Sequence, residues 1–205
     1  MKLYFHPFSG NSRRVLLTAA HLDVALEHQL IDLAKGEQRT PAHLGRQPNG
    51  VVPVLEDDGF VLWESRAIMQ YLCEKTPGQT LLPSELRARA DVQRWLFWCA
   101  VHMAPAAGVL VKERFVKTFR NEAPDPVEEK RGEALFAQYA SVLDTHLASK
   151  TWVAQDKLTL ADYSIACGFA LAVPARLPLE PYKHLRSWFG RVTELPAWQK
   201  TQPPR

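Results

Sequence analysis

The sequence lacks the features that mark several large classes of protein. Its 25 Lys and Arg residues nearly balance 22 Asp and Glu residues, and the basic residues form no block, which argues against a nucleic-acid partner. No unbroken apolar run approaches the roughly 20 residues that span a bilayer. The first residues also lack the apolar core of a signal peptide. We therefore expect a cytoplasmic protein with neither a membrane nor a nucleic-acid partner.

Cysteines are few and do not form a pattern. The three, Cys73, Cys99 and Cys167, are odd in number, far apart and set in apolar helical patterns. This predicts buried free thiols, without a disulfide framework and without a metal site.

The stretch from 49 to 68 carries the strongest local signals. Two short apolar runs, 52–55 and 60–63, flank Asp57-Asp58-Gly59 and predict a tight β-hairpin. The second run meets Glu64-Ser65, after which apolar residues recur at helical spacing, so a strand passes directly into a helix.

Such a junction can hold the α-amino-acid end of a small ligand. The helix start offers unpaired N–H groups to a carboxylate, Ser65 adds a hydroxyl, and Glu64 can hold an amine. Pro53 cannot donate a ladder bond at the start of its strand. If Val52-Pro53 is cis, the turn presents the N–H and C=O of Val52 to a peptide backbone. The same pattern also fits an ordinary hairpin followed by a serine-capped helix that binds no ligand.

The order of elements predicts two domains. A strand at 2–5, a helix after the turn at 9–12, a strand at 25–33, a short irregular helix, the hairpin and its helix form an α/β domain with a mixed sheet. The pattern stops at Thr76-Pro77-Gly78. We assign residues 1–76 to this domain, 77–84 to a linker and 85–205 to an all-helical domain.

The helical domain shows three further signals. A long amphipathic pattern at 87–119 is interrupted near Pro105 and Gly108, where a kink or a break is expected. A second helix is predicted at 127–149. Thr159 and Asp162 form a capping box before a buried helix that runs to about residue 171, and a last helix spans about 184–194.

Together these motifs resemble the soluble glutathione transferases over essentially the whole chain. The residues that carry the resemblance are Ser9 in the turn after the first strand, Val52-Pro53, 64–68 and 158–162. The resemblance implies a thioredoxin-like βαβαββα domain and an all-helical domain. The segment His6-Pro7-Phe8-Ser9, followed by 13–16, is similar to the serine-dependent phi and theta classes and their bacterial relatives.

The resemblance implies that Ser9 is the catalytic residue. Its hydroxyl would donate a hydrogen bond to the glutathione thiolate, helped by the positive end of the following helix. Ser9 also fits a simple N-cap, Ser12 competes for both roles, and Asn11 could donate to the sulfur as well. Tyr4 lies earlier than a catalytic tyrosine would.

The resemblance to the family also implies the remaining contacts with glutathione. Val52, beside Pro53, would pair with the cysteinyl unit, and Glu64 with Ser65 would hold the γ-glutamyl group. Gln38 and Arg39 occupy the loop that faces the glycyl carboxylate. Gln38 departs from the usual histidine, and Val51 from the glutamine that often precedes the Val-Pro pair. Each departure predicts binding weaker by about 1 kcal/mol.

For the second substrate we expect a small hydrophobic electrophile against Phe8, His102 and Met103, although His102 also fits an ordinary half-buried histidine. The sequence thus predicts a homodimeric glutathione transferase, with glutathione as co-substrate and no cofactor, that attacks an electrophile or reduces an organic hydroperoxide. The alternative is a non-catalytic protein-interaction module of the same fold.

Overall fold

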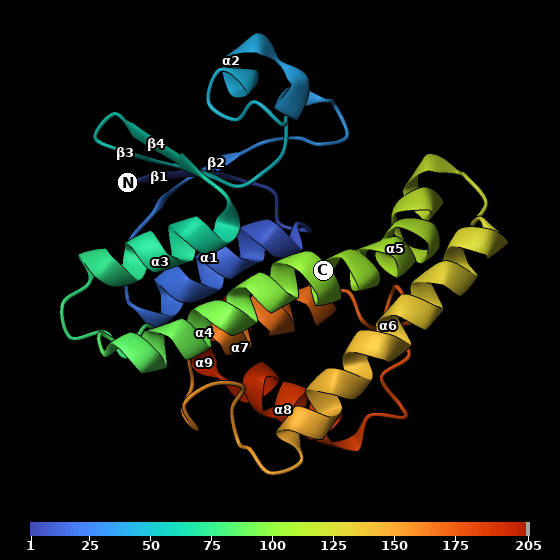
Figure 1. Cartoon of the computed structure of the whole chain (residues 1–205). Coiled ribbons are helices and arrows are strands. Elements are labelled where there is room, and N and C mark those ends of the chain that lie inside the picture. The colour runs from blue at the N-terminus through green and yellow to red at the C-terminus, as the bar shows by residue number, and fades with distance from the viewer. Residues whose placement is uncertain (204–205) are drawn as a thin grey trace. The chain divides into compact units, whose positions relative to one another are not determined.

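The computed structural model describes residues 1–203, which form two compact units (Figure 1). One unit comprises Met1–Gln79 and the segment that begins at Leu195, and the other comprises Thr80–Glu194. We expected the helical domain to continue to residue 205, but the segment from Leu195 belongs to the first unit. The reason is Arg13, whose guanidinium lies 3.8 Å from the centroid of the Trp198 ring and donates to the Trp198 carbonyl at 3.2 Å.

The first unit is built on a mixed four-stranded sheet. Its strands are β1 (Lys2–Phe5), β2 (Glu27–Leu30), β3 (Val54–Asp57) and β4 (Phe60–Trp63), in the order β2-β1-β3-β4. β1 pairs parallel with β2 and antiparallel with β3, and β3 pairs antiparallel with β4. The expected mixed sheet and hairpin are confirmed. β2 is shorter than predicted because it is an exposed edge strand.

The two faces of the sheet differ in how they are covered. α1 (Gly10–His21) and α3 (Ser65–Lys75) lie side by side on one face, where Leu3, Val15 and Ile68 are fully buried (Figure 1). The other face carries a smaller cluster around Tyr4 and Val54. The short helices η1 (Glu37–Arg39) and α2 (Pro41–Leu44) follow β2, and α9 (Pro196–Lys200), which the sequence did not predict, packs on α1.

The second unit begins with one long interrupted helix. α4 (Leu86–Trp98) passes through a π-turn, η2 (Cys99–Met103), into α5 (Ala104–Arg114) and η3 (Val116–Arg120). Pro105 supplies no N–H and crowds the preceding turn, and the wider π-turn directly before it accommodates this loss. The expected irregularity near Pro105 is therefore a π-turn within a continuous helical path.

Averaging hydropathy over a window gives a different result for this path from counting unbroken apolar residues. Leu86–Arg120 is 35 residues long and contains an 18-residue window with a mean hydropathy of 1.3, so it is long and apolar enough to cross a membrane by length and composition alone. Counting unbroken apolar residues did not detect this stretch, whereas a window average tolerates scattered charged residues. Core helices of globular proteins meet the same criteria, and Val92, Leu96 and Leu110 of this stretch are buried.

The other helices of this unit are α6 (Pro126–Leu147), α7 (Leu160–Ala166), η4 (Cys167–Phe169) and α8 (Lys183–Glu194). The predicted capping box is confirmed at the start of α7, which ends earlier than expected. The fully buried Asp162 carboxylate accepts hydrogen bonds from the Thr159 N–H and hydroxyl, the Val153 N–H and the Trp188 indole, at 2.8–3.1 Å.

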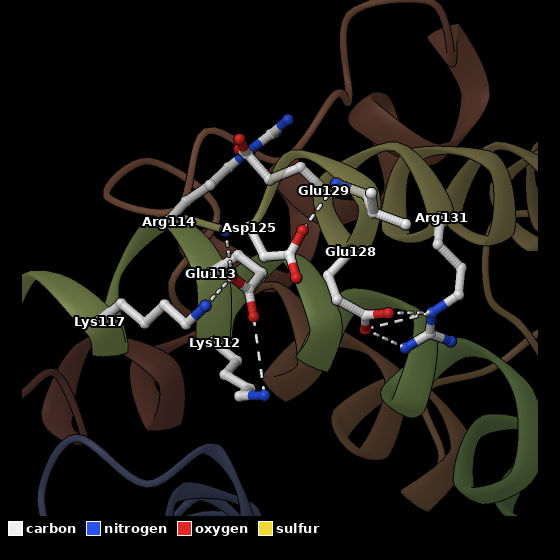
Figure 2. Close-up of polar contacts among 9 residues, drawn as sticks. Lys112, Glu113, Arg114, Lys117, Asp125, Glu128, Glu129 and Arg131 are labelled. Atoms are coloured by element: carbon white, nitrogen blue, oxygen red, sulfur yellow. Dashed lines mark hydrogen bonds and ion pairs between the residues drawn. The ribbon is translucent and has the colours of Figure 1, made fainter. Parts of the chain in front are cut away.

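A polar network closes the turn between α5 and α6 (Figure 2). Glu113, 1% exposed, accepts from the Asp125 N–H at 2.8 Å and from the Lys117 ammonium. The Arg114 guanidinium forms an ion pair with Glu129, with Nε 2.7 Å from the carboxylate oxygen. It also donates a hydrogen bond to the Arg176 carbonyl. The hydrogen bond from the Asp125 N–H, and after it the one from Lys117, lower the pKa of Glu113. The network explains how a linker with two prolines keeps a fixed turn.

The three cysteines are buried free thiols, as the sequence predicts. Burial raises the pKa of the Cys73 thiol to about 12, so this thiol carries no negative charge near neutral pH.

Asp162→Asn should destabilise the second unit strongly. An amide oxygen cannot accept all four hydrogen bonds, and the new NH₂ group would face buried donors, so we expect the free energy of unfolding to fall by about 3 kcal/mol. Urea denaturation followed by circular dichroism measures this change. The control is Asp156→Asn, whose exposed pair with Lys150 should contribute little. Equal stability of the two variants would contradict the role given to Asp162.

Candidate functional site

Four predicted site segments leave the sheet at the same edge. β1 runs parallel to β2 with Phe5 opposite Leu30, and Tyr4 lies opposite Val54 at the start of β3. Val54 in turn lies opposite Trp63, the last residue of β4. The end of β1, the end of β2, the start of β3 and the end of β4 therefore coincide. The segments that carry Ser9, Gln38 and Glu64 begin there, and the segment that carries Val52 ends there.

The turn after β1 places two serines in different environments. Ser9 is the N-cap of α1, and its hydroxyl oxygen accepts the Ser12 N–H at 3.2 Å. Within residues 1–203, the Ser9 hydroxyl proton has no acceptor, so Ser9 can still donate. Ser12 is fully buried, and its hydroxyl oxygen accepts the His6 N–H at 3.2 Å. The cap role of Ser9 and a donor role are compatible.

The other polar residues near this turn are engaged elsewhere. The Tyr4 phenol donates to Glu56 at 2.9 Å, and burial with this bond raises the pKa of Tyr4. Asn11 is exposed and accepts from Arg14. His6 accepts the Phe8 N–H on Nδ1 at 3.3 Å, and burial lowers the pKa of His6, with the Asp32 charge acting in the opposite direction.

The junction of β4 and α3 has two features of an anion site. Glu64, the N-cap residue, has a φ of 73° and makes no side-chain cap bond, so the first-turn N–H groups of α3 remain without a cap. A non-glycine residue at such a φ is costly and is enriched at binding sites. The buried Ser65 hydroxyl also has no hydrogen-bond partner among the described residues. The sequence predicted the junction but not the backbone of Glu64.

The segment before β3 is held in place by residues that the sequence did not single out. The Val52-Pro53 peptide is cis, and the N–H and C=O of Val52 form no hydrogen bond within residues 1–203. The buried His43 ring fixes the preceding residue through Nε2, which lies 2.9 Å from the Val51 carbonyl oxygen. Spacing alone gave no sign of this contact.

Gln38 and Arg39 lie in η1, against the turn that contains Gly50. A Cβ at Gly50, whose φ is +61°, would lie 3.1 Å from the Gln38 carbonyl oxygen and 3.2 Å from Cδ of Arg39. Gly50 therefore permits this close packing. Arg39 is exposed, whereas the Gln38 side-chain oxygen is buried without a partner among the described residues.

The three residues expected to line a second-substrate pocket differ in exposure. Phe8 is 46% exposed on the first unit. In the second unit, His102 is half-buried and stacks on Tyr139 with ring centroids 5.0 Å apart, which fits the ordinary histidine that the sequence left open. Met103 is fully buried, which argues against a place in a pocket wall.

Comparisons with known proteins cover both halves of the chain. The family model described as "Glutathione S-transferase, N-terminal domain" matches residues 1–74, and that described as "Glutathione S-transferase, C-terminal domain" matches residues 95–196. Glutathione S-transferase 3 of Zea mays is 36% identical over 208 residues, which cover 98% of this chain and 92% of the relative.

Solved structures agree in fold. Glutathione transferase F7 from Populus trichocarpa superposes with a TM-score of 0.91 at 27% identity, covering 98% of this chain and 96% of that one. A glutathione S-transferase-I bound with lactoylglutathione gives a TM-score of 0.88 at 27% identity, covering 98% and 97%. The plant relatives agree with a phi-like class, and their names favour an enzyme over a non-catalytic module. The chain therefore belongs to the glutathione S-transferase family and is a glutathione transferase with a thioredoxin-like domain and a helical domain.

Proposed function

We propose that Ser9 activates glutathione by donating its hydroxyl proton to the thiolate sulfur. One observation carries this proposal. The Ser9 hydroxyl oxygen accepts the hydrogen bond that caps α1, while the hydroxyl proton has no acceptor among the described residues and is available to a ligand. The N-terminus of α1 adds a partial positive charge near the sulfur. Ser12 is the weaker candidate because it is fully buried and already accepts the His6 N–H.

The Ser9 hydrogen bond and the N-terminus of α1 can together lower the thiol pKa by the amount that catalysis requires. A free thiol with a pKa of about 8.5 is mostly protonated at neutral pH, and the thiolate is the nucleophile. Lowering that pKa by about 2 corresponds to roughly 2.7 kcal/mol. A hydrogen bond to a charged group supplies about 1.5–3 kcal/mol, and a helix end supplies about 0.3–1 kcal/mol. Ser9 thus acts as a donor and forms no covalent intermediate.

The peptide part of glutathione would be held along the same sheet edge. Val52, at the cis Pro53, offers a free N–H and C=O to the cysteinyl unit. The uncapped start of α3 and the Ser65 hydroxyl suit the γ-glutamyl carboxylate, with Glu64 at its amine. The relative that holds lactoylglutathione, at a TM-score of 0.88, supports a glutathione site on this fold.

The glycyl end would meet Gln38 and Arg39. Arg39 supplies an exposed cation. The unpartnered Gln38 side-chain oxygen can only accept a hydrogen bond, so Gln38 could contact a carboxylate only through its NH₂ group. Because the amide lacks the charge that a protonated histidine could carry, we expect the glycyl carboxylate to be held mainly by Arg39.

The thiolate would then attack a small hydrophobic electrophile, with reduction of organic hydroperoxides as a related use of the same nucleophile. The exposed Phe8 ring, one residue before Ser9, supplies apolar surface beside the proposed sulfur position. We further propose a cytoplasmic homodimer without a cofactor. Phe60 and Trp63, 50% and 38% exposed on the hairpin, are apolar surface that a second copy would cover.

Ser9→Ala should raise the pKa of enzyme-bound glutathione by 1–2 and lower kcat/KM for chlorodinitrobenzene near pH 6.5 by about 10- to 100-fold, because one charge-assisted hydrogen bond is lost. Thiolate absorbance against pH and steady-state kinetics measure these effects. Ser9→Gly, which keeps most of the helix cap, should show the same loss. Ser12→Ala should leave the thiol pKa unchanged, and a rise in that variant alone would contradict the assignment to Ser9.

Ser65→Ala should weaken glutathione binding by about five- to tenfold, the worth of about 1 kcal/mol, without changing the pKa of the bound thiol. The reason is that Ser65 would contact the carboxylate end of glutathione, away from the sulfur. Isothermal titration with glutathione measures the affinity, and the exposed Ser84→Ala is the matched control. Unchanged affinity in Ser65→Ala would remove Ser65 from the site.

A further inference from the structure

The short helix α2 carries a buried histidine, His43, which is 2% exposed. Its backbone is fixed at the start of the helix, because the Thr40 hydroxyl oxygen accepts the His43 N–H at 3.4 Å. The turn after α2 is also tied to the sheet. Arg46 Nε lies 3.7 Å from the Glu56 carboxylate, and the guanidinium carbon of Arg46 lies 4.7 Å from the centroid of the Tyr4 ring. The His43 ring is therefore held on a well-anchored segment.

The ring makes one hydrogen bond within residues 1–203, and this bond defines its tautomer. Nε2 lies 2.9 Å from the Val51 carbonyl oxygen. A carbonyl oxygen can only accept, so Nε2 carries a proton and donates it. Nδ1 is buried, and a proton on it would find no acceptor among the described residues. The surroundings of His43 therefore favour the tautomer with the proton on Nε2.

The Val51 carbonyl and the Val52 N–H belong to the same peptide group. This peptide is trans, so its C=O and its N–H point in opposite directions. Because His43 holds the carbonyl, the Val52 N–H is directed away from the His43 ring. That N–H has no partner within residues 1–203 and is one of the groups proposed to meet the cysteinyl unit of glutathione.

Within the described chain, no other hydrogen bond fixes the orientation of this peptide. The backbone is held by hydrogen bonds at Gly50, before the peptide, and by sheet pairing at Val54, after it. Between them, the N–H of Val51 and both polar groups of Val52 have no partner within residues 1–203. A peptide plane turns on two soft dihedrals, here ψ of Val51 and φ of Val52. Its orientation therefore depends on the bond from His43.

We infer that His43 is a positioning residue for glutathione, acting through the peptide between Val51 and Val52. Its Nε2–H holds the Val51 carbonyl, which sets the direction of the Val52 N–H before the ligand arrives and so lowers the cost of binding. The inference rests on the proposed contact between Val52 and the cysteinyl unit. His43 itself contacts neither the peptide nor the sulfur of glutathione, so it contributes to affinity and not to thiolate formation at Ser9.

His43→Phe keeps a ring of similar size and removes the donor. We expect the Kd and the KM for glutathione to rise about fivefold, the worth of one hydrogen bond, with kcat at saturating glutathione and the pKa of the bound thiol unchanged. His43→Gln, whose amide nitrogen reaches about as far as Nε2, should restore most of the affinity. Isothermal titration and steady-state kinetics measure these effects. Equal losses in the two variants would assign the effect to packing and overturn the inference.

His146→Phe is the matched control. The His146 ring also places Nε2 against a backbone carbonyl, that of Val153, at 2.7 Å, but it does so in the second unit. This variant should lower the free energy of unfolding without changing glutathione affinity. An equal loss of affinity in His146→Phe would show that reduced stability weakens binding, and the positioning role of His43 would fall.

Two measurements on the unaltered full chain do not depend on the variants. Nitrogen-15 NMR of the histidine rings should show the Nε2–H tautomer for His43, and the Nδ1–H tautomer would overturn the inference. Hydrogen exchange at the Val52 amide should slow when glutathione is added. An unchanged exchange rate would remove Val52 from the glutathione site and the inference with it. Slowed exchange together with unchanged affinity in His43→Phe would keep the Val52 contact and overturn the positioning role alone.

Discussion

The pairing of β1 with β3 is the constraint on which the candidate site depends. Its register sets Tyr4 opposite Val54, which aligns the end of β1 with the start of β3. A shift by one residue would exchange the two faces of β3 and move Val54 away from its buried cluster. Because Leu3 and Leu55, on the opposite face, are also fully buried, the core opposes such a shift from both sides.

This register also places the starts of two helices at the candidate site. α1 starts directly after the turn, so its N-cap and the proposed sulfur donor are the same residue, Ser9. α3 starts directly after β4, with the strained Glu64 as its N-cap. Two helix starts thus face one edge of the sheet, and both favour negative charge there. Glutathione carries a thiolate and carboxylates, so its charges match what the backbone supplies before any side chain is considered.

Features that depend on neighbouring residues could be predicted from the sequence, and these included the hairpin, the capping box at Thr159 and the strand-to-helix junction at Ser65. Features that depend on distant residues could not. The positive φ of Glu64, the packing of Gly50 on Gln38 and the docking of Trp198 on Arg13 all arise from tertiary contacts. The inward side chain of Met103 has a related cause. The π-turn adds a residue to the helix, which rotates the faces expected from a regular period by about 100°.

The Arg13–Trp198 contact makes the first unit discontinuous in sequence. The chain leaves this unit after Gln79, completes all of the second unit, and returns at Leu195 to supply Trp198. A single cut in the connection near residue 80 would therefore release a fragment that lacks Trp198, on which its buried Arg13 packs. Recombination or engineering that exchanges the helical unit between relatives needs two junctions. The segment from Leu195 must then come from the same parent as α1, because that helix and this segment form one packed interface.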